Sequence, residues 1–315
     1  MILTVTLNTA LDITYGLAEV VRHGSNRVTV TQQAGGKGVN VARVLAALGR
    51  PVVVTGLAGG STGRAVRADL AGAGIAEDLV PLAGEARRTV AVVESRHGDT
   101  TVYLEPGPAV TAGEWREFAT RYERLLGGAE AVVLSGSLPP TLPDDTYRRL
   151  VLTAHRHGVP AVLDTAGPAL LAALGAGPAL VKPNAAELAA ATGTEDPLAG
   201  AEALRAAGAR AVVASLGPDG LLACAPEGRW RARLPERLSG NPTGAGDSAV
   251  AALVAGLVDG TPWPERLRRA AALSGATVAA ALAGRFDPVA RARLLGLVEV
   301  EALASEDAAD RAPGT

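Results

Sequence analysis

Residues 241–248 read Asn-Pro-Thr-Gly-Ala-Gly-Asp-Ser and lead into the helical stretch AVAALVAGLVDG. The glycines permit a tight turn, and the first turn of a helix presents backbone N–H groups that have no intrahelical partner. These donors and the helix dipole predict an anion-binding site. Asp247 stands beside it, where a carboxylate can take a proton from a hydroxyl while the amides hold a transferring phosphoryl group. For an isolated Gly-x-Gly-Asp, an acidic residue that merely favours the helix start would be the better interpretation.

A second glycine cluster, residues 34–40 (AGGKGVN), opens another predicted helix at 41–48. It lacks the Gly-Lys-Ser/Thr of a P-loop, and it is not a GxGxxG fingerprint that follows a strand. The bare backbone, the ammonium group and the amide side chain suit a polyol that carries a phosphate. An ordinary glycine turn with a solvated lysine fits this segment equally well.

A third segment, residues 180–187 (LVKPNAAE), follows a predicted strand and begins a helix. Asn184 and Glu187 are three residues apart and therefore share a helix face. A carboxylate and an amide suit Mg²⁺ held partly through water. The same pair has the spacing of a capping box, and in isolation the capping box is the favoured interpretation.

The rest of the chain alternates short β-branched runs with alanine-rich helical stretches. Continuous apolar strands of this kind are typical of a parallel sheet covered by helices on both faces. Two regions, 13–34 and 88–104, instead alternate polar and apolar residues and predict a small antiparallel sheet, which would be a lid over a site, a dimer surface or both. Strands are predicted at 52–55, 131–134, 161–163, 180–181 and 211–214, and helices at 40–48, 63–73, 144–157 and 199–207.

Composition excludes several other classes of protein. Thirty Lys and Arg residues against 32 Asp and Glu give a net charge of −2 without a basic stretch, which argues against nucleic-acid binding. The single cysteine, Cys224, forbids an intrachain disulfide, and the four histidines show no ligand spacing. The longest uncharged alanine-rich stretch, 270–284, is too short to span a membrane, and the N-terminus does not resemble a signal peptide. We expect a cytoplasmic protein with no membrane partner, one domain over residues 1–300, and a flexible tail at 301–315.

Ten short motifs, in this order, resemble those of the PfkB family of ribokinase-like carbohydrate kinases. The chain is most similar to the phosphosugar branch, which comprises 1-phosphofructokinases, tagatose-6-phosphate kinases and minor 6-phosphofructokinases. The resemblance implies a three-layer α/β/α fold with a mainly parallel central sheet and a small antiparallel β lid. The motifs are TLNTALD (6–12), GSNR (24–27), GGKGVNVARVLAALG (35–49), GEAR (84–87), EPGP (105–108), SGSLPP (135–140), LDTAG (163–167), VKPNAAEL (181–188), SLGPDG (215–220) and NPTGAGDS (241–248).

The resemblance also implies roles on the nucleotide side, with ATP and Mg²⁺ as cofactors. Asp247 matches the family's catalytic base, and its place at a helix start leads us to expect an ionised, weakly basic carboxylate. Glu187 and Asn184 match an element that acts on Mg²⁺ through water. The amides matching the anion hole for the γ-phosphate are those of Gly244, Ala245 and Gly246, and the nucleotide-binding positions are Lys182, Asn184, Ser215, Gly217 and Gly220.

On the acceptor side, five positions match residues that contact sugar hydroxyls, namely Asp12, Gly35, Gly36, Asn40 and Ser137. Lys37, Arg87 and Arg27 match the cationic cluster that holds the sugar's existing phosphate, with Arg27 supplied by the partner in some dimers of this branch. The resemblance therefore implies a homodimer, joined through the lid, that phosphorylates a phosphorylated ketohexose.

Among phosphosugars, we favour fructose 1-phosphate, with fructose 1,6-bisphosphate as product. Lys37 in GGKG and Asn26-Arg27 in GSNR resemble the fructose-1-phosphate and tagatose-6-phosphate enzymes, whereas the minor 6-phosphofructokinases tend to carry a further glycine where Lys37 stands. Tagatose-6-phosphate kinase and fructose-6-phosphate kinase are the alternatives within the branch. A catalytically silent sugar-phosphate-binding protein is the alternative from another class, and retention of Asp247 argues against it. A dinucleotide-dependent oxidoreductase is disfavoured because the first βα turn lacks the fingerprint.

Overall fold

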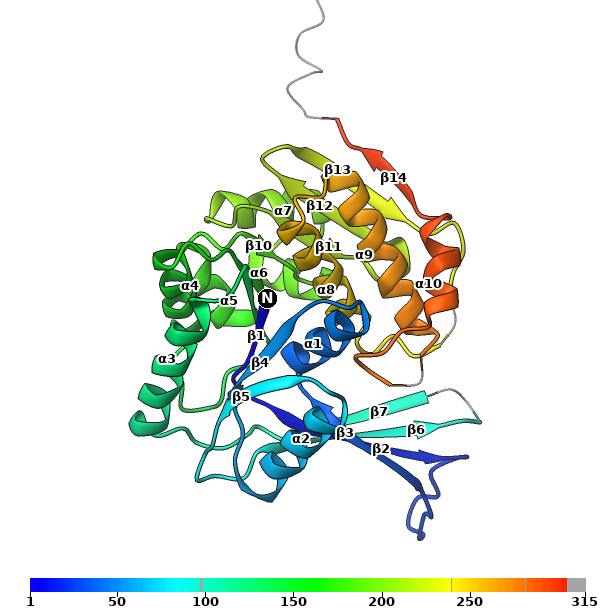
Figure 1. The fold of residues 1–315 in the computed structure, drawn as a ribbon. Coiled ribbons are helices and arrows are strands. Elements are labelled where there is room, and N and C mark those ends of the chain that lie inside the picture. The colour runs from blue at the N-terminus through cyan, green and yellow to red at the C-terminus, as the bar shows by residue number, and fades with distance from the viewer. Residues whose placement is uncertain (97–98, 239, 281, 305–315) are drawn as a thin grey trace, which may run out of the picture.

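The computed structural model describes residues 1–96, 99–238, 240–280 and 282–304, which form a body with one large sheet and a small projecting sheet (Figure 1). The large sheet is parallel from β5 through β11 and antiparallel from β11 to β14. Its strands, in spatial order, are β14 (Glu299–Ala302), β13 (Gly228–Arg233), β12 (Leu221–Ala225), β11 (Val212–Ser215), β10 (Leu180–Val181), β9 (Ala161–Asp164), β8 (Ala131–Ser135), β1 (Ile2–Thr6), β4 (Val52–Leu57) and β5 (Ala76–Val80).

Helices cover both faces of this sheet, which confirms the predicted ribokinase-like α/β class. One apolar core lies beneath α3 (Ala112–Leu126), α4 (Thr146–Arg156), α5 (Gly167–Leu174), α6 (Ala185–Thr192) and α7 (Pro197–Ala206). The other lies beneath α1 (Lys37–Ala47), α8 (Ala245–Val258), α9 (Trp263–Val278) and α10 (Pro288–Leu295). Successive strand residues alternate between the two cores, as Val133 and Leu134 do, because side chains of a strand point to opposite faces.

The small sheet, hereafter the lid, has the strand order β3-β2-β6-β7. Its strands are β2 (Ala10–Leu17), β3 (Thr29–Gly35), β6 (Arg87–Glu94) and β7 (Asp99–Leu104). The two outer pairs are antiparallel, as expected, whereas the central β2–β6 pair is parallel. The parallel pair arises because β2 and β6 both begin at the base of the lid and run outward. A third apolar core joins this base to α2 (Gly60–Gly72).

Most element boundaries agree with the sequence-based expectations to within a few residues. The five predicted strands are all present. Helix α1 begins at Lys37, earlier than the predicted starts at 40 and 41, because Gly36 already occupies the N-cap. Strand β14 continues two residues past the expected end of the domain at 300, and residues 305–315 of the predicted tail lie outside the described residues. Among the helices of the described ranges, none has the length and apolar character needed to cross a bilayer.

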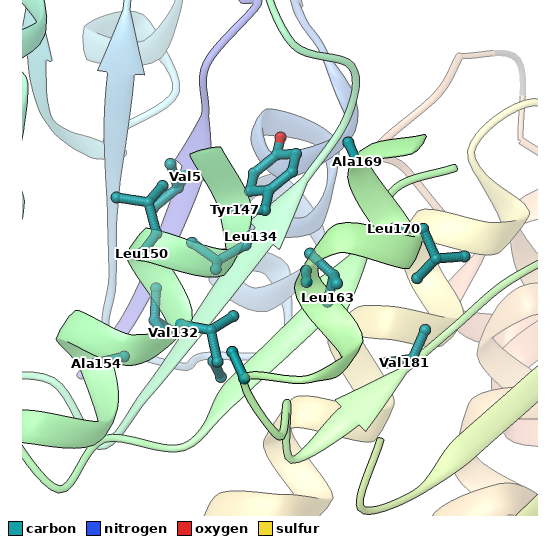
Figure 2. Packing of buried hydrophobic residues seen from close by; sticks show 14 of the residues in the cluster. Val5, Val132, Leu134, Tyr147, Leu150, Ala154, Leu163, Ala169, Leu170 and Val181 are labelled. Carbon is teal, nitrogen blue, oxygen red and sulfur yellow. The ribbon is translucent and has the colours of Figure 1, made fainter. Parts of the chain in front are cut away.

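The core between β8, β9, α4 and α5 supports the floor of the site described below (Figure 2). Leu134 and Leu163 lie on adjacent strands, and Tyr147 and Leu150 of α4 pack over them. The Tyr147 hydroxyl donates a hydrogen bond to the carbonyl of Gly136 at 2.9 Å, so this core also holds the loop after β8.

We expect Leu134→Ala to lower the free energy of unfolding by about 2–5 kcal/mol, since a fully buried leucine leaves a cavity when it is truncated. The matched control is Leu171→Ala, because Leu171 is 47% exposed and its truncation should change stability by roughly 0.5 kcal/mol or less. Chemical denaturation of both variants checks this. Equal losses in the two variants would contradict the assignment of Leu134 to the core.

Candidate active site

The start of α8 has the geometry of an anion-binding site. Its N-cap, Gly244, has a φ of +85°, and a Cβ at this position would lie 3.0 Å from the Cα of Ala283, so both conformation and space require glycine. The helix is closed by the bond from Ser248 N to Gly244 O, and the N–H groups before Ser248 therefore have no acceptor four residues back. One predicted donor is weakened, because Ala245 N already donates to Pro242 O at 3.1 Å.

Asp247 lies in the first turn of α8 and is only 7% exposed. Asn40 of α1 donates a hydrogen bond from Nδ2 to Asp247 Oδ2 at 2.8 Å. Burial and the nearby charge of Asp164 raise the pKa of Asp247 to about 7, against the lowering effects of Lys37, Asn40 and Lys182. The expectation of a weakly basic carboxylate is wrong, because burial outweighs the helix-start position.

Two lysines converge on one buried carboxylate at the carboxyl ends of neighbouring parallel strands. Lys37 Nζ lies 3.2 Å and Lys182 Nζ 3.5 Å from Asp164 Oδ1. Asp164 ends β9 and is 1% exposed, and its other oxygen accepts a hydrogen bond from Ser135 Oγ at 3.3 Å. The sequence analysis gave Asp164 no role, although its place at the end of a predicted parallel strand was a usable signal.

Lys37 lies beside a second carboxylate as well as Asp164. Its Nζ also lies 3.8 Å from Glu187 Oε1. Burial lowers the pKa of the Lys37 ammonium, but the charges of Asp164, Glu187 and Asp247 outweigh burial and raise it overall. The side chain is therefore a cation surrounded by the carboxylates of Asp164, Glu187 and Asp247. The sequence analysis placed Lys37 in one cationic cluster with Arg87 and Arg27. The ion pairs of Lys37 are instead with Asp164 and Glu187.

The Asn184–Glu187 pair forms the capping box that the sequence allowed. Asn184 N donates to Glu187 Oε2 at 2.9 Å, and Glu187 N donates to Asn184 Oδ1 at 2.8 Å. No cluster of three or more potential metal-binding His, Cys, Asp or Glu residues occurs in the part of the chain that the structure describes. Glu187 Oε1 takes no part in the box and lies 3.8 Å from Lys37 Nζ, and this donor set fits a Mg²⁺ ion that keeps several waters and binds chiefly to substrate phosphates.

The remaining predicted nucleotide-side residues lie at the end of the adjacent strand. Ser215 ends β11, its N–H donates to Pro183 O at 3.0 Å, and it forms an isolated bridge with Asn184. Gly217 begins and Gly220 follows the short 3₁₀ turn after β11. The structure thus brings these residues to the same edge of the sheet as Lys182.

The acceptor-side residues come from the lid base and the loop after β8. Asp12 pairs with Gln33 across the β2–β3 ladder, and its carboxyl lies against Gly35, where a Cβ would be 2.1 Å from it. Burial raises the pKa of Asp12 to about 6, while Thr89, Arg87 and Arg43 act to lower it. Gly36 lies directly next to Gly35 at the N-cap of α1.

Asn8 is a buried residue that the sequence analysis did not single out. Its Nδ2 donates hydrogen bonds to Pro106 O at 2.9 Å and to Ser137 Oγ at 3.2 Å, and its carbonyl accepts one from Arg87 Nε at 3.0 Å. Asn8 therefore fixes Ser137 and Arg87 relative to each other. Arg27, by contrast, lies in the exposed connection between β2 and β3, away from these contacts within the chain.

The profile of the pfkB family carbohydrate kinases matches residues 6–289. The chain belongs to the PfkB family. The structure of phosphofructokinase-2 from Escherichia coli in complex with substrates and products is 30% identical, covers 94% of this chain and 98% of its own, and superposes with a TM-score of 0.85. A Thermotoga maritima protein whose name gives 1-phosphofructokinase as a possible activity is 26% identical, with coverages of 96% and 99% and a TM-score of 0.88.

Membership of the PfkB family makes this chain a phosphotransferase that uses ATP. A Staphylococcus aureus protein, named as a candidate phosphofructokinase, is 28% identical to this chain. The match covers 97% of this chain and all of that protein, with a TM-score of 0.82. The PfkB chain thus spans nearly the whole length of each of these relatives.

For the PfkB kinase we expect kcat to rise with pH through about 7, since only the carboxylate form of Asp247 accepts a proton and its pKa is raised to about 7. Asp247→Asn should reduce turnover by roughly 10²–10⁴-fold while nucleotide affinity changes little. Steady-state kinetics from pH 5.5 to 9 and calorimetric titration with an ATP analogue check both expectations. Retention of more than half of the wild-type turnover would show that Asp247 is not the base.

Proposed function

We propose that this kinase transfers the γ-phosphate of ATP to a hydroxyl of a phosphorylated ketohexose, with fructose 1-phosphate as acceptor and fructose 1,6-bisphosphate as product. The observation that carries the proposal is the half-buried guanidinium of Arg87 beside the acceptor-side carboxylate of Asp12. A half-buried cation at this place suits an acceptor that carries an anionic group.

The contacts of Arg87 leave it equipped to bind a phosphate. Its Nε donates to Asn8 O at 3.0 Å and its Nη1 to Glu105 O at 3.3 Å, both neutral carbonyls. Burial lowers the pKa of Arg87, against the opposing charges of Asp12 and Glu105, yet a guanidinium stays protonated in proteins. With five N–H donors in a planar fork, it retains donors for a bidentate phosphate contact.

The proposed reaction uses the charged residues at the start of α8 and around Asp164. As the acceptor oxygen forms its bond to the γ-phosphorus and the bond to ADP breaks, Asp247 takes the hydroxyl proton. Lys37 and Lys182 stand beside Asp164, where positive charge stabilises the oxygens of the transferring group, and the first amides of α8 orient it. Mg²⁺, held near Glu187 through water, would neutralise charge on the nucleotide phosphates. A loose transition state makes such positioning more important than base strength.

Lys37 together with the Asn26-Arg27 pair favours fructose 1-phosphate or tagatose 6-phosphate over fructose 6-phosphate, and of the first two we propose fructose 1-phosphate. Tagatose 6-phosphate and fructose 6-phosphate are the competing acceptors. The structurally similar proteins include both a phosphofructokinase-2 and a 1-phosphofructokinase candidate. These similarities support a sugar phosphate as acceptor but do not favour one sugar phosphate over another. A non-catalytic sugar-phosphate-binding protein would have no use for a buried carboxylate with a pKa of about 7.

A coupled assay of ADP formation with fructose 1-phosphate, tagatose 6-phosphate, fructose 6-phosphate and unphosphorylated fructose tests the proposal. We expect the highest kcat/KM with fructose 1-phosphate and the lowest with fructose. Turnover of fructose alone would overturn the assignment to sugar phosphates.

We expect Arg87→Ala to raise the KM for the sugar phosphate by roughly 10- to 150-fold, equivalent to the ~1.5–3 kcal/mol of a charge-assisted hydrogen bond. The KM for ATP should change little. Arg88→Ala is the matched control, since Arg88 is 55% exposed and pairs with Glu105 at the surface. If both KM values rise equally in Arg87→Ala, Arg87 serves the nucleotide instead.

We further propose that two chains dimerise through the lid. β3 and β7 are the outer strands of the lid, and unpaired strand edges favour pairing with another chain. Val30, Val102, Tyr103 and Leu104 are each more than 45% exposed on these strands. The lid also carries a hollow of about 820 Å³ whose lining includes Tyr15 and Tyr103. A second copy of the same surface would cover these apolar groups in a two-fold dimer.

Mixed dimers test whether Arg27 acts on the partner's site. Pairing one Arg27→Ala subunit with one Asp247→Asn subunit should keep about half of the wild-type activity if Arg27 acts across the interface, because the site with the intact Asp247 then receives Arg27 from its partner. Almost complete loss of activity would instead place Arg27 in its own subunit, because each site of the mixed dimer then lacks either Arg27 or Asp247. A sedimentation experiment that finds only monomer at micromolar concentration would refute the dimer itself.

A further inference from the structure

Gln33 is a buried lid residue on the acceptor side that the reaction described above does not use. It lies in β3 directly opposite Asp12 in the β2–β3 register, and it is 5% exposed. Since residues two apart in a strand share a face, Gln33 lies on the same face as Gly35, against which the Asp12 carboxyl packs. The amide of Gln33 therefore belongs to the surface that carries Asp12.

The side chain of Gln33 extends from the lid to the connection between α9 and α10. Its Nε2 donates a buried hydrogen bond to the carbonyl of Ala283 at 2.9 Å, across 250 residues of sequence. Figure 1 shows this connection approaching the lid base beside α1. This contact is thus a direct polar link between the lid and the connection that follows α9.

The same connection packs against the catalytic groups of α1 and α8. A Cβ at Gly244, the N-cap of α8, would lie 3.0 Å from Ala283 Cα and 3.1 Å from Gly284 N. A Cβ at Gly284 would lie 3.2 Å from Asn40 Oδ1, on the side chain that donates to Asp247. These distances show that no side chain would fit between the connection and the two elements, so a shift of Ala283 toward them would displace the anion-binding turn or Asn40.

The other end of the Gln33 amide is available to a ligand. Gln33 Oε1 is buried and has no hydrogen-bond partner among the residues that the structure describes. A buried amide oxygen left without a donor is destabilising, whereas a hydroxyl group supplies the missing hydrogen bond. Carbohydrate acceptors are rich in such hydroxyls, and the neighbouring carboxylate of Asp12 suits the same chemistry.

We propose that Gln33 is a positioning residue that couples the two substrate sites: its Oε1 accepts a hydrogen bond from an acceptor hydroxyl while its Nε2 holds Ala283, and thereby the anion-binding turn of α8, in place. The proposal rests on the assignment of the Asp12 surface to the acceptor. Binding of the acceptor fixes the amide and favours the conformation that receives the γ-phosphate. By linkage, nucleotide binding orders β3 in return.

The variant that tests this link is Gln33→Met, which keeps the length of the side chain and removes both polar atoms. Gln32→Met is the matched control, because Gln32 is the adjacent, exposed residue of the same strand. Gln33→Asn is a second variant that keeps the amide but is one methylene too short to reach Ala283. Hydrogen exchange is measured for the peptide over residues 29–35, with and without the ATP analogue AMP-PNP and Mg²⁺. This readout needs no acceptor.

AMP-PNP should slow exchange in β3 of the wild type and of Gln32→Met, and should have no such effect in Gln33→Met or Gln33→Asn. The second measurement is made by calorimetry. It is the dissociation constant of AMP-PNP without sugar divided by the dissociation constant in the presence of the sugar that the wild type phosphorylates fastest. We expect this ratio to fall by about 3- to 10-fold in both Gln33 variants, with AMP-PNP affinity alone changed less than 3-fold.

Equal protection of β3 by AMP-PNP in the wild type and in both Gln33 variants would overturn the coupling role, as would an unchanged ratio of dissociation constants. A purely structural role would weaken nucleotide binding with and without sugar by the same factor, and that result also contradicts the proposal. Failure of the proposed substrate class is a separate outcome, seen when the wild type phosphorylates fructose but no sugar phosphate.

Discussion

The sharing of one buried carboxylate by two lysines is the interaction on which the rest of the site depends. Asp164 lies within 3.5 Å of the ammonium groups of both Lys37 and Lys182, at the carboxyl ends of parallel strands. An unpaired buried charge is strongly unfavourable, so Lys182, whose side chain is only 4% exposed, depends on Asp164 for its counter-charge, and Asp164 is the nearer of the two carboxylates beside Lys37. The charge of Asp164 also helps to raise the pKa of Asp247, the residue that we propose as the base, to about 7.

The lid contacts the body through Gln33 and Ala283, close to Asn40 and Gly244. Asp247 is buried from one side by α1, through Asn40, and the turn before it is crowded by the α9–α10 connection, which Gln33 links to the lid. The proposed acceptor side and nucleotide side are thus bordered by the same segments. In a phosphotransferase, such packing helps to exclude water, which would otherwise compete as the acceptor.

The sequence predicted the features that depend on local pattern. Continuous apolar strands alternating with helices predicted the parallel sheet, and the glycine-rich segment NPTGAGDS predicted a tight turn at the start of α8. Properties that depend on long-range burial were not predictable. The pKa of Asp247 is raised because distant segments bury it, and the roles of Asn8 and Gln33 follow from contacts with Pro106 and Ala283. The capping box of Asn184 was predicted, whereas its relation to Mg²⁺ stays a prediction.

The most direct test of the central claim is the pH dependence of kcat for Asp164→Asn compared with the wild type. Removing the charge of Asp164 removes a contribution that raises the pKa of Asp247 and leaves the lysines free to stabilise the carboxylate. The account predicts that the residual activity of the variant rises with pH at an apparent pKa lower than that of the wild type by roughly one unit or more. An apparent pKa that is unchanged or higher would contradict it.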